Sequence, residues 1–215
     1  MLITMEGIEG SGKSTQIAHI AAYFHQKGYE CVVTREPGGT KIGEKIRRIL
    51  LDRDHDMLDA MAELLLYTAD RAQHVSEIIK PALDKGNIVI CDRFLDSTIA
   101  YQGAARGIGP DTVTSINRLV LKGIWPDITF LLDLPSEIGL SRAWRAIDAG
   151  ARDTSQSRFE REKIVFHEKV RQGYLALAEA EPERIRIIDA SASPGDVKAA
   201  LLEQLKAISG EKRMP

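Results

Sequence analysis

The fold is decided by one stretch near the N-terminus, Gly7-Ile8-Glu9-Gly10-Ser11-Gly12-Lys13-Ser14. The run before it, Leu2-Ile3-Thr4-Met5, is short and mostly apolar, which predicts a buried strand. After it, apolar residues recur on one helical face from Lys13 to about Gln26. A glycine, four further residues and then Gly-Lys-Ser, placed between a strand and a helix, form the pattern of a phosphate-binding loop.

The chemistry of such a loop explains its residue types. Glycines let several backbone N–H groups converge on one point, and the following helix adds the positive end of its dipole. We expect Lys13 to reach the terminal phosphates of a nucleoside triphosphate and Ser14 to bind Mg²⁺. An ordinary glycine-rich turn is the alternative, but strand, loop and helix follow in the order that the motif requires. The residues expected to bind the nucleotide are Gly7, Ile8, Glu9, Gly10, Ser11, Gly12, Lys13, Ser14 and Thr15.

Length and composition restrict the class of protein. The chain has 215 residues, of which 44% are hydrophobic and 28% charged, as in a single globular α/β domain. Its net charge of −2 gives no basic surface for nucleic acid. No apolar run approaches the roughly 20 residues that span a bilayer, and the N-terminus enters a strand with no signal peptide. Cys31 and Cys91 lie in strand-like runs, which favours buried thiols in a reducing cytoplasm.

Strands and helices are expected to alternate along the chain. Runs rich in apolar residues predict strands at 2–5, 29–34, 87–92, 128–134 and 184–188. Helical periodicity predicts helices at 13–26, 41–51, 57–83, 94–103, 111–121, 135–147, 159–180 and 194–208. This order predicts a three-layer α/β fold of the phosphate-loop NTPase kind, with a five-stranded parallel sheet and helices on both faces. We expect one domain over residues 1–209 and a frayed tail over 210–215.

Polar residues follow two of the expected strands, at the sheet edge where such folds bind ligands. The loop Arg35-Glu36-Pro37-Gly38-Gly39-Thr40 follows the second strand. Its alternative is an ordinary turn in which Arg35 and Glu36 pair in solvent. Asp92 and Arg93 end the third strand, so Asp92 is expected to serve Mg²⁺ and Arg93 a second anion. The alternative there is a surface ion pair.

Two helical stretches place polar and aromatic side chains on shared faces. The expected helix 57–83 directs Leu58, Met61, Ala62, Leu65, Leu66 and Ala69 to its apolar side. In the same helix Tyr67 and Arg71 stand four residues apart, which suits a planar ring with Arg71 at its edge. A solvated arginine resting on a core tyrosine is the alternative. In the stretch 94–103, Ser97 pairs with Tyr101 and Thr98 with Gln102 at the same spacing, which suits a base or a sugar.

Arginines gather around a polar stretch between two expected helices. Arg142, Arg145, Arg152, Arg158 and Arg161 surround the run Ala151-Arg152-Asp153-Thr154-Ser155-Gln156-Ser157-Arg158. We expect residues of about 142–160 to form a mobile cationic lid and name them the lid segment. A solvated, charge-rich connector is the alternative.

Together these motifs resemble those of the bacterial thymidylate kinases, from Leu2 to Ile208. The motifs that carry the resemblance are Glu6-Gly-Ile-Glu-Gly-Ser-Gly-Lys-Ser14, Thr34-Arg-Glu-Pro-Gly-Gly-Thr40, Ala69-Asp-Arg71, Asp92-Arg93, Ser97-Thr-Ile-Ala-Tyr-Gln-Gly103 and Phe166-His-Glu-Lys-Val-Arg-Gln-Gly-Tyr-Leu175. The phosphate loop is shared with many families, whereas the Arg-Glu-Pro-Gly-Gly-Thr loop together with Asp-Arg and Ala-Tyr-Gln-Gly is far more specific.

The resemblance implies an activity and roles for individual residues. It implies a cytoplasmic homodimeric kinase that transfers the γ-phosphoryl group of ATP to dTMP with Mg²⁺, for nucleotide biosynthesis. The implied dTMP-binding residues are Glu9, Glu36, Pro37, Tyr67, Arg71, Arg93, Ser97, Thr98, Tyr101 and Gln102. The expected metal site comprises Ser14, Asp92 and Glu9.

The family also places a cation at the transferring phosphoryl group. The phosphate loop here lacks arginine, so the resemblance implies that the lid supplies it. The expected catalytic residues are Lys13, Arg93, Arg145, Arg152 and Arg158. Ser157 stands where many relatives have aspartate, which leaves open which of the three lid arginines acts.

Two other functions remain as alternatives. A deoxynucleoside kinase shares the phosphate loop and the Asp-Arg strand end, but needs a base for a sugar hydroxyl, for which Glu9 or Glu36 is available. A nucleotide-dependent switch or DNA-associated ATPase shares only the loop. The near-neutral charge and the lack of an Asn-Lys-x-Asp pattern weigh against this second class.

Overall fold

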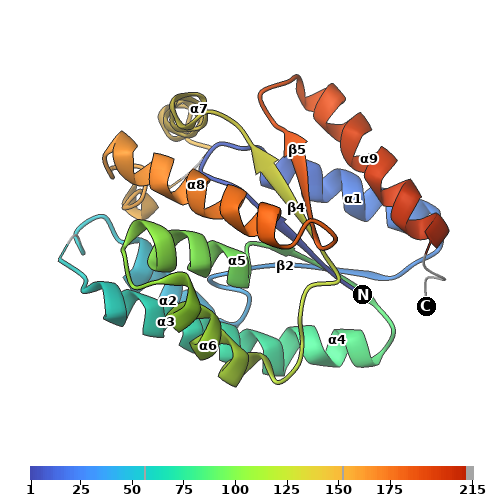
Figure 1. Cartoon of the computed structure of the whole chain (residues 1–215), viewed down its shortest axis with the longest axis horizontal. Helices are drawn as coiled ribbons and strands as arrows, with labels where there is room; N and C mark the ends of the chain where they lie inside the picture. The colour runs from blue at the N-terminus through green and yellow to red at the C-terminus, as the bar shows by residue number, and fades with distance from the viewer. Residues whose placement is uncertain (56, 152, 212–215) are drawn as a thin grey trace.

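The computed structural model describes residues 1–55, 57–151 and 153–211. Its centre is a five-stranded parallel sheet with the strand order β2-β3-β1-β4-β5 (Figure 1). The strands are β1 (Leu2–Glu6), β2 (Cys31–Arg35), β3 (Ile88–Asp92), β4 (Ile128–Asp133) and β5 (Ile185–Asp189). This confirms the predicted α/β class and parallel sheet, with strand bounds that differ from those expected by one or two residues at most ends.

The helices occur in the predicted order. They are α1 (Lys13–Gln26), α2 (Lys41–Leu51), α3 (Ala60–His74), α4 (Lys80–Asp84), α5 (Leu95–Thr98), α6 (Pro110–Leu121), α7 (Ser136–Asp148), α8 (Ile164–Ala180) and α9 (Pro194–Glu211). A π-helical turn over Val75–Ile79 joins α3 to α4, and a second one over Ile99–Ala105 continues α5. A 3-10 turn, Thr154–Gln156, lies between α7 and α8.

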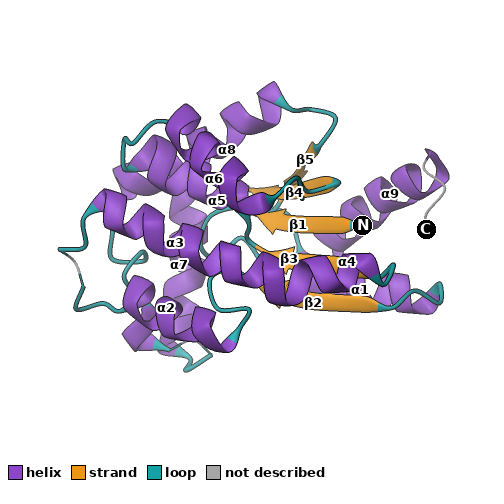
Figure 2. Ribbon diagram, turned by 90° about the horizontal axis from the view of Figure 1, so that it is seen from below, coloured by secondary structure: helices purple, strands orange, loops and turns teal. Residues whose placement is uncertain are grey.

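Helices cover both faces of the sheet (Figures 1 and 2). Helices α1 and α9 pack side by side on one face, while α4 and α8 pack on strands from the other. Residues of β1 alternate accordingly, because successive strand side chains point to opposite faces. Ile3 and Met5 belong to the cluster that includes Ile20 and Phe24 of α1, whereas Leu2 packs with Leu64 of α3. All five strands end at the same edge of the sheet, as parallel strands joined by helices must.

The prediction for the apolar side of α3 was wrong for three of its six residues. Met61, Leu65 and Ala69 are exposed, Leu58, Ala62 and Leu66 are half-buried, and the buried side of α3 includes Glu63 and Arg71. The hydrophobic pattern predicted a displaced face because the inner side of this helix carries charged residues beside Leu64. The long helix expected over 57–83 is also interrupted by the π-helical turn.

Two other expectations concern the ends of helices. Helix α8 begins at Ile164, five residues later than predicted, and the preceding residues belong to the connector from α7. Helix α9 runs to Glu211, so it includes the first two residues of the expected tail. The rest of that tail lies outside the described residues.

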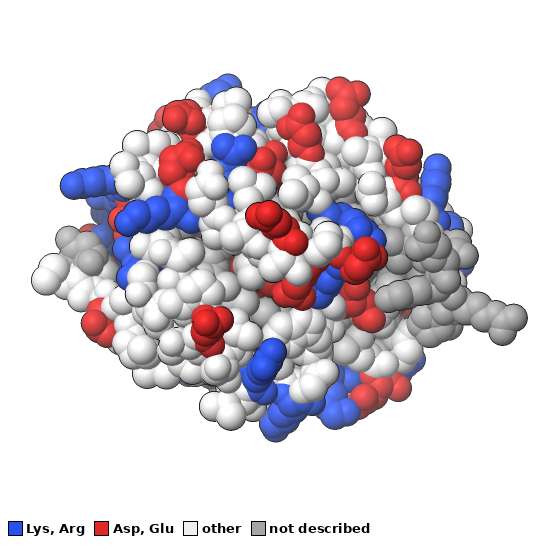
Figure 3. Space-filling model, in the orientation of Figure 1, with Lys and Arg blue, Asp and Glu red and all other residues white. Residues whose placement is uncertain are grey.

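The surface carries charges of both signs. On the face shown in Figure 3, lysine and arginine side chains alternate with aspartate and glutamate side chains, and no large area has a single sign. Within the described ranges, no helix combines the length and the apolar character needed to cross a membrane.

Candidate active site

The phosphate loop wraps around its own lysine. Gly7, Gly10 and Gly12 adopt positive φ angles of 134°, 71° and 92°, which turn the chain from β1 into α1. Lys13 Nζ donates to the carbonyl oxygens of Gly7 and Ile8, each at 2.9 Å. Burial, reinforced by the nearby positive charge of Arg93, lowers the pKa of Lys13 to about 8. The ammonium therefore lies among carbonyl groups in a strongly desolvated position, from which a phosphate group would attract it.

Ser14 and Asp92 meet at the start of α1. The Ser14 hydroxyl donates to Asp92 Oδ2 at 3.4 Å, and the other carboxylate oxygen of Asp92 is buried without a hydrogen-bond partner in the described part of the chain. A hydroxyl beside an unsatisfied carboxylate oxygen is a donor set that Mg²⁺ uses when it also binds phosphates. No group of three or more His, Cys, Asp and Glu residues within the described ranges is arranged to hold a metal ion by itself. Ser14 and Asp92 thus fit a cation shared with a nucleotide.

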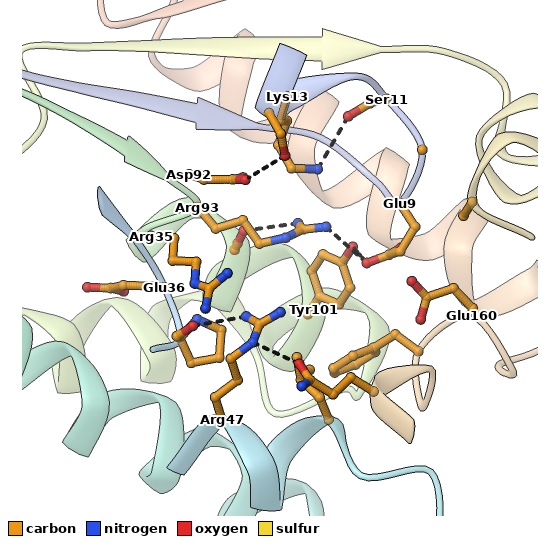
Figure 4. Close-up of a pocket in the computed structure, with 18 of the residues that line it drawn as sticks. Glu9, Ser11, Lys13, Arg35, Glu36, Arg47, Asp92, Arg93, Tyr101 and Glu160 are labelled. Atoms are coloured by element: carbon orange, nitrogen blue, oxygen red, sulfur yellow. Dashed lines mark hydrogen bonds and ion pairs between the residues drawn. The ribbon is translucent and has the colours of Figure 1, made fainter. Parts of the chain in front are cut away.

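Arg93 follows β3 directly and adopts a positive φ of 67°. Its guanidinium Nη1 donates to the carbonyl of Gly7 at 2.9 Å and to the hydroxyls of Ser97 and Tyr174 at 3.3 and 3.2 Å. Both hydroxyls lie within hydrogen-bond distance of the buried Glu6 carboxylate, to which each donates. The hydroxyl oxygens are therefore free to accept from Arg93. The left-handed backbone and this network aim the side chain across the phosphate loop (Figure 4).

Glu9 faces Arg93 from the phosphate loop (Figure 4). Its Oε1 atom accepts from Arg93 Nη2 at 2.9 Å and from the Tyr101 hydroxyl at 2.6 Å. Its Oε2 atom lies 3.3 Å from Nδ1 of His167. Burial alone would raise the pKa of Glu9, but the charge of Arg93 and the contact with His167 lower it well below its usual value. The Glu9 carboxylate therefore contacts Arg93, Tyr101 and His167. The two other residues of the expected metal site, Ser14 and Asp92, contact each other.

Residues 35–40, which we name the Glu36 loop, are fixed by a buried charge network. Glu36 is buried, and its two carboxylate oxygens accept from Arg71 Nε at 2.8 Å and contact His74 Nδ1 at 2.9 Å. Arg71 also donates to Asn117 Oδ1 and to the carbonyl of Phe94. The solvent pairing that we considered is absent, because Arg35 pairs with Glu44 instead. Nor is Arg71 a solvated side chain, since it is almost completely buried.

These groups border one cavity of about 670 Å³. It runs from the phosphate loop along the ends of β2 and β3 to α3 and the π-helical turn after α5. Thr98 contributes a buried hydroxyl with no partner among the described residues. Gln102, by contrast, already donates to Glu63 at 2.6 Å. The cavity is lined by all the residues for which we predicted contact with the acceptor: Glu9, Glu36, Pro37, Tyr67, Arg71, Arg93, Ser97, Thr98, Tyr101 and Gln102.

The arginines of the lid segment occupy different environments. Arg145 is exposed and donates to Ser141 on its own helix, outside the described lining of the cavity. Arg158 is buried against Glu63 at 2.6 Å, and its Nε atom donates to the carbonyl of Leu50. Arg152, the third candidate, lies outside the described residues. The sequence does not distinguish these environments, because they depend on contacts with residues of distant elements.

Several cavity residues had no role assigned from the sequence. Arg47 of α2 donates to the carbonyl of Pro37 at 2.9 Å and to Gln156 Oε1 at 3.0 Å, which links the Glu36 loop to the lid segment. Arg142 of α7 also lines the cavity and donates to the carbonyl of Ala190. Arg142 was recognised only as one of several arginines near the lid. Arg47 belongs to no motif that would indicate its role, since charged residues are common on exposed helix faces.

Comparison with known proteins identifies the family. The thymidylate kinase family matches residues 5–201. The chain belongs to the thymidylate kinase family. The thymidylate kinase of Desulfosudis oleivorans is 50% identical over 97% of each chain, and that of Desulforapulum autotrophicum is 56% identical over 88% of this chain and 84% of its own. The crystal structure of thymidylate kinase from Ehrlichia chaffeensis matches with a TM-score of 0.76 and 36% identity, over 96% of this chain and 98% of that one.

The family assignment confirms the predicted enzyme class. Thymidylate kinases are transferases that phosphorylate dTMP to dTDP with ATP, in the synthesis of dTTP. The resemblance seen in the sequence motifs and its implied activity are therefore confirmed, and the fold is that of the matched crystal structure.

Proposed function

We propose that the cavity holds ATP and dTMP in one chamber, with ATP on the phosphate loop and the dTMP phosphate beside Arg93. One observation carries this assignment. Lys13 and Arg93, two cationic side chains from different elements, border the same cavity and both contact the carbonyl of Gly7. Such a pair suits a reaction in which two phosphate groups have to approach each other.

The chemistry needs little proton transfer. A nucleoside monophosphate is largely dianionic at neutral pH, since a phosphate monoester has a second pKa of about 6. The acceptor oxygen is therefore already a nucleophile, and no base is required. Lys13 and Arg93 would offset the repulsion between the two anions and stabilise the negative charge of the transferring group.

Ser14 and Asp92 would hold Mg²⁺ together with the ATP phosphates. This assignment is supported by their mutual contact and by the unsatisfied oxygen of Asp92. Bound there, Mg²⁺ would neutralise phosphate charge. We assign Glu9 to the acceptor side, because its carboxylate contacts Arg93 and Tyr101.

The base and sugar of dTMP would occupy the part of the cavity away from the phosphate loop. Tyr67 and Arg71 border it from α3, and Thr98 and Gln102 border it from the other wall. The unpartnered hydroxyl of Thr98 is available for a polar edge of thymine. Tyr101, held by Glu9, would lie against the deoxyribose.

The contacts of the lid-segment arginines indicate which of them can reach the transferring phosphoryl group. Arg158 is bound to Glu63 in a buried pair, so we favour a structural role for it. Arg142 borders the cavity, and among the described residues Arg145 donates to Ser141 of its own helix. We therefore propose that Arg142, with Arg145 or Arg152, supplies positive charge to the transferring phosphoryl group when the lid segment closes.

We further propose that the enzyme is a cytoplasmic homodimer. Helices α2 and α3 pack together and expose four large apolar side chains, with exposed fractions of 41–52%: Ile42, Ile49, Met61 and Leu65. A cluster of this kind fits a self-complementary interface. Leu65→Glu should shift the mass measured by light scattering from dimer to monomer. Both cysteines are free, as expected in a reducing compartment.

An assay of ADP release with ATP and Mg²⁺ tests the function directly. Acceptors would be dTMP, dUMP, dCMP, AMP, UMP and thymidine. Turnover with dTMP well above the other acceptors supports the proposal. Turnover with thymidine but not dTMP would instead indicate a nucleoside kinase and would remove Arg93 from its role as phosphate clamp. Hydrolysis of ATP with no acceptor preference would contradict both.

A further inference from the structure

The two oxygens of the Glu9 carboxylate have unequal surroundings. Oε1 accepts two hydrogen bonds, from Arg93 at 2.9 Å and from Tyr101 at 2.6 Å. Oε2 is buried and accepts none from the described residues, yet His167 Nδ1 lies only 3.3 Å away. An ionised carboxylate with one bare buried oxygen is costly, so a donor that approaches Oε2 is strongly favoured.

His167 is the potential hydrogen-bond donor to Glu9 Oε2. It lies in the first turn of α8, is completely buried, and neither ring nitrogen has a hydrogen bond to the described residues. His74, the other fully buried histidine, is held on both sides, by Glu36 and Thr34. Among the described residues, the contact with Glu9 is thus the polar contact that the His167 ring makes. A neutral ring protonated on Nδ1 and a charged ring both present a proton there.

We propose that His167 is a positioning residue for the reaction, which fixes the phosphate-loop acid Glu9 by donating from Nδ1 to Oε2. Held at Oε2, the carboxylate presents Oε1 to Arg93 and Tyr101 together. The orientation of the Arg93 guanidinium therefore depends on a side chain that lies outside the described cavity lining. The inference rests on the proposed role of Arg93 as the clamp for the dTMP phosphate.

Side-chain substitutions separate positioning from packing. His167→Asn keeps a donor near the Nδ1 position, whereas His167→Leu keeps a similar volume without one. We expect the leucine variant to raise the KM for dTMP by roughly ten-fold or more, the effect of losing one hydrogen bond to a charged group, with the KM for ATP changed by less than about three-fold. The asparagine variant should restore the KM for dTMP to within about three-fold of the parent. Val165→Ala, at an exposed position two residues earlier in α8, is the matched control and should leave both values unchanged.

A second measurement asks whether His167 acts through Glu9. In a Glu9→Gln background, His167→Leu should cause little further loss, because the acceptor that it orients has already been changed. Independent, multiplicative losses would overturn the proposal, as would equal losses from leucine and asparagine. If the leucine variant does not fold, His167→Gln, which places its donor near the Nε2 position, replaces it and should behave unlike asparagine.

The same assays distinguish failure of the inference from failure of the proposed function. A parent enzyme that does not phosphorylate dTMP refutes the function. A parent that phosphorylates dTMP, together with a folded His167→Leu variant of unchanged KM for dTMP, refutes only the role of His167.

Discussion

The guanidinium of Arg158 lies 2.6 Å from the carboxylate of Glu63, and both side chains are buried. Glu63 belongs to α3 and also accepts from Gln102, beside the expected base site. Arg106 contacts the same carboxylate and pairs with Glu162, just before α8. This charge network attaches the exit of the lid segment to the wall of the acceptor cavity.

The first prediction is that Arg158 is needed for stability. Arg158→Met removes a positive charge beside the buried Glu63 carboxylate and the hydrogen bond to the carbonyl of Leu50. Because breaking a buried ion pair strands a charge, we expect a loss of about 3 kcal/mol in the free energy of unfolding. For a chain of this size that corresponds to a Tm lower by roughly 6–12 °C, measurable by calorimetry.

Arg161→Met is the matched control for this prediction, since Arg161 is exposed three residues later. Its free energy of unfolding should change by less than about 0.5 kcal/mol. If Arg158→Met has the same free energy of unfolding as the control but loses most of its turnover, Arg158 has a catalytic role instead.

The second prediction concerns Arg93. Arg93→Ala removes the proposed phosphate clamp, so the KM for dTMP should rise roughly 30-fold or more, as when one partner of a buried charge pair is truncated. The affinity for ATP, measured by calorimetric titration, should change far less, because the loop and Lys13 remain. An equal loss of both affinities would contradict the assignment.

The third prediction concerns the metal. Asp92→Asn should raise the Mg²⁺ concentration required for half-maximal turnover by roughly 10–100-fold, because it removes the negative charge that binds the ion or its water molecules. Chelation of Mg²⁺ should abolish turnover in the parent. Asp84→Asn, at an exposed carboxylate of α4, serves as control and should leave the Mg²⁺ dependence unchanged. An unaltered Mg²⁺ requirement in Asp92→Asn would exclude this residue from the metal site.

The fourth prediction is a proton uptake that accompanies ATP binding. The pKa of Lys13 falls from 10.5 to about 8 on folding. At a pH between about 8 and 10.5 and without ATP, Lys13 is protonated in the unfolded chain and largely deprotonated in the folded chain. The contribution of Lys13 to the free energy of unfolding therefore rises with pH in this range. The triphosphate favours the charged lysine. ATP binding at about pH 8.5 should therefore take up protons, with less uptake at about pH 7.5.

Calorimetry in two buffers of different ionisation enthalpy measures that uptake. Binding heats that do not depend on the buffer at the higher pH, with ATP affinity intact, would show that Lys13 is already charged or remote from the phosphates.

The sequence predicted the parts of the molecule that depend on local signals. Helices α1 and α2 have the predicted bounds, because glycines or a capping threonine mark their starts: the Thr40 side chain accepts from the Gly43 backbone N–H. Glu36, which follows β2, and Asp92, which ends β3, also lie at the cavity, as expected for an open parallel sheet.

Other features depend on contacts between distant segments. Glu63 looks like a solvent residue in a helical pattern, and only the fold brings Arg158 and Gln102 to it. The same network explains why Met61 and Leu65 of α3 face outward although they are apolar. The link from His167 to Glu9 likewise joins two motifs of the resemblance that are far apart in the chain.

Close contact between two backbones also limits how the enzyme can move. A Cβ atom at Gly10 would lie 2.0 Å from the carbonyl oxygen of Gly139, so the phosphate loop and α7 touch without any side chain between them. The first half of α7 is thereby packed directly against the phosphate loop. The lid closure that we propose would therefore bend the chain beyond Gly139, in the last two turns of α7, which carry Arg142 and Arg145.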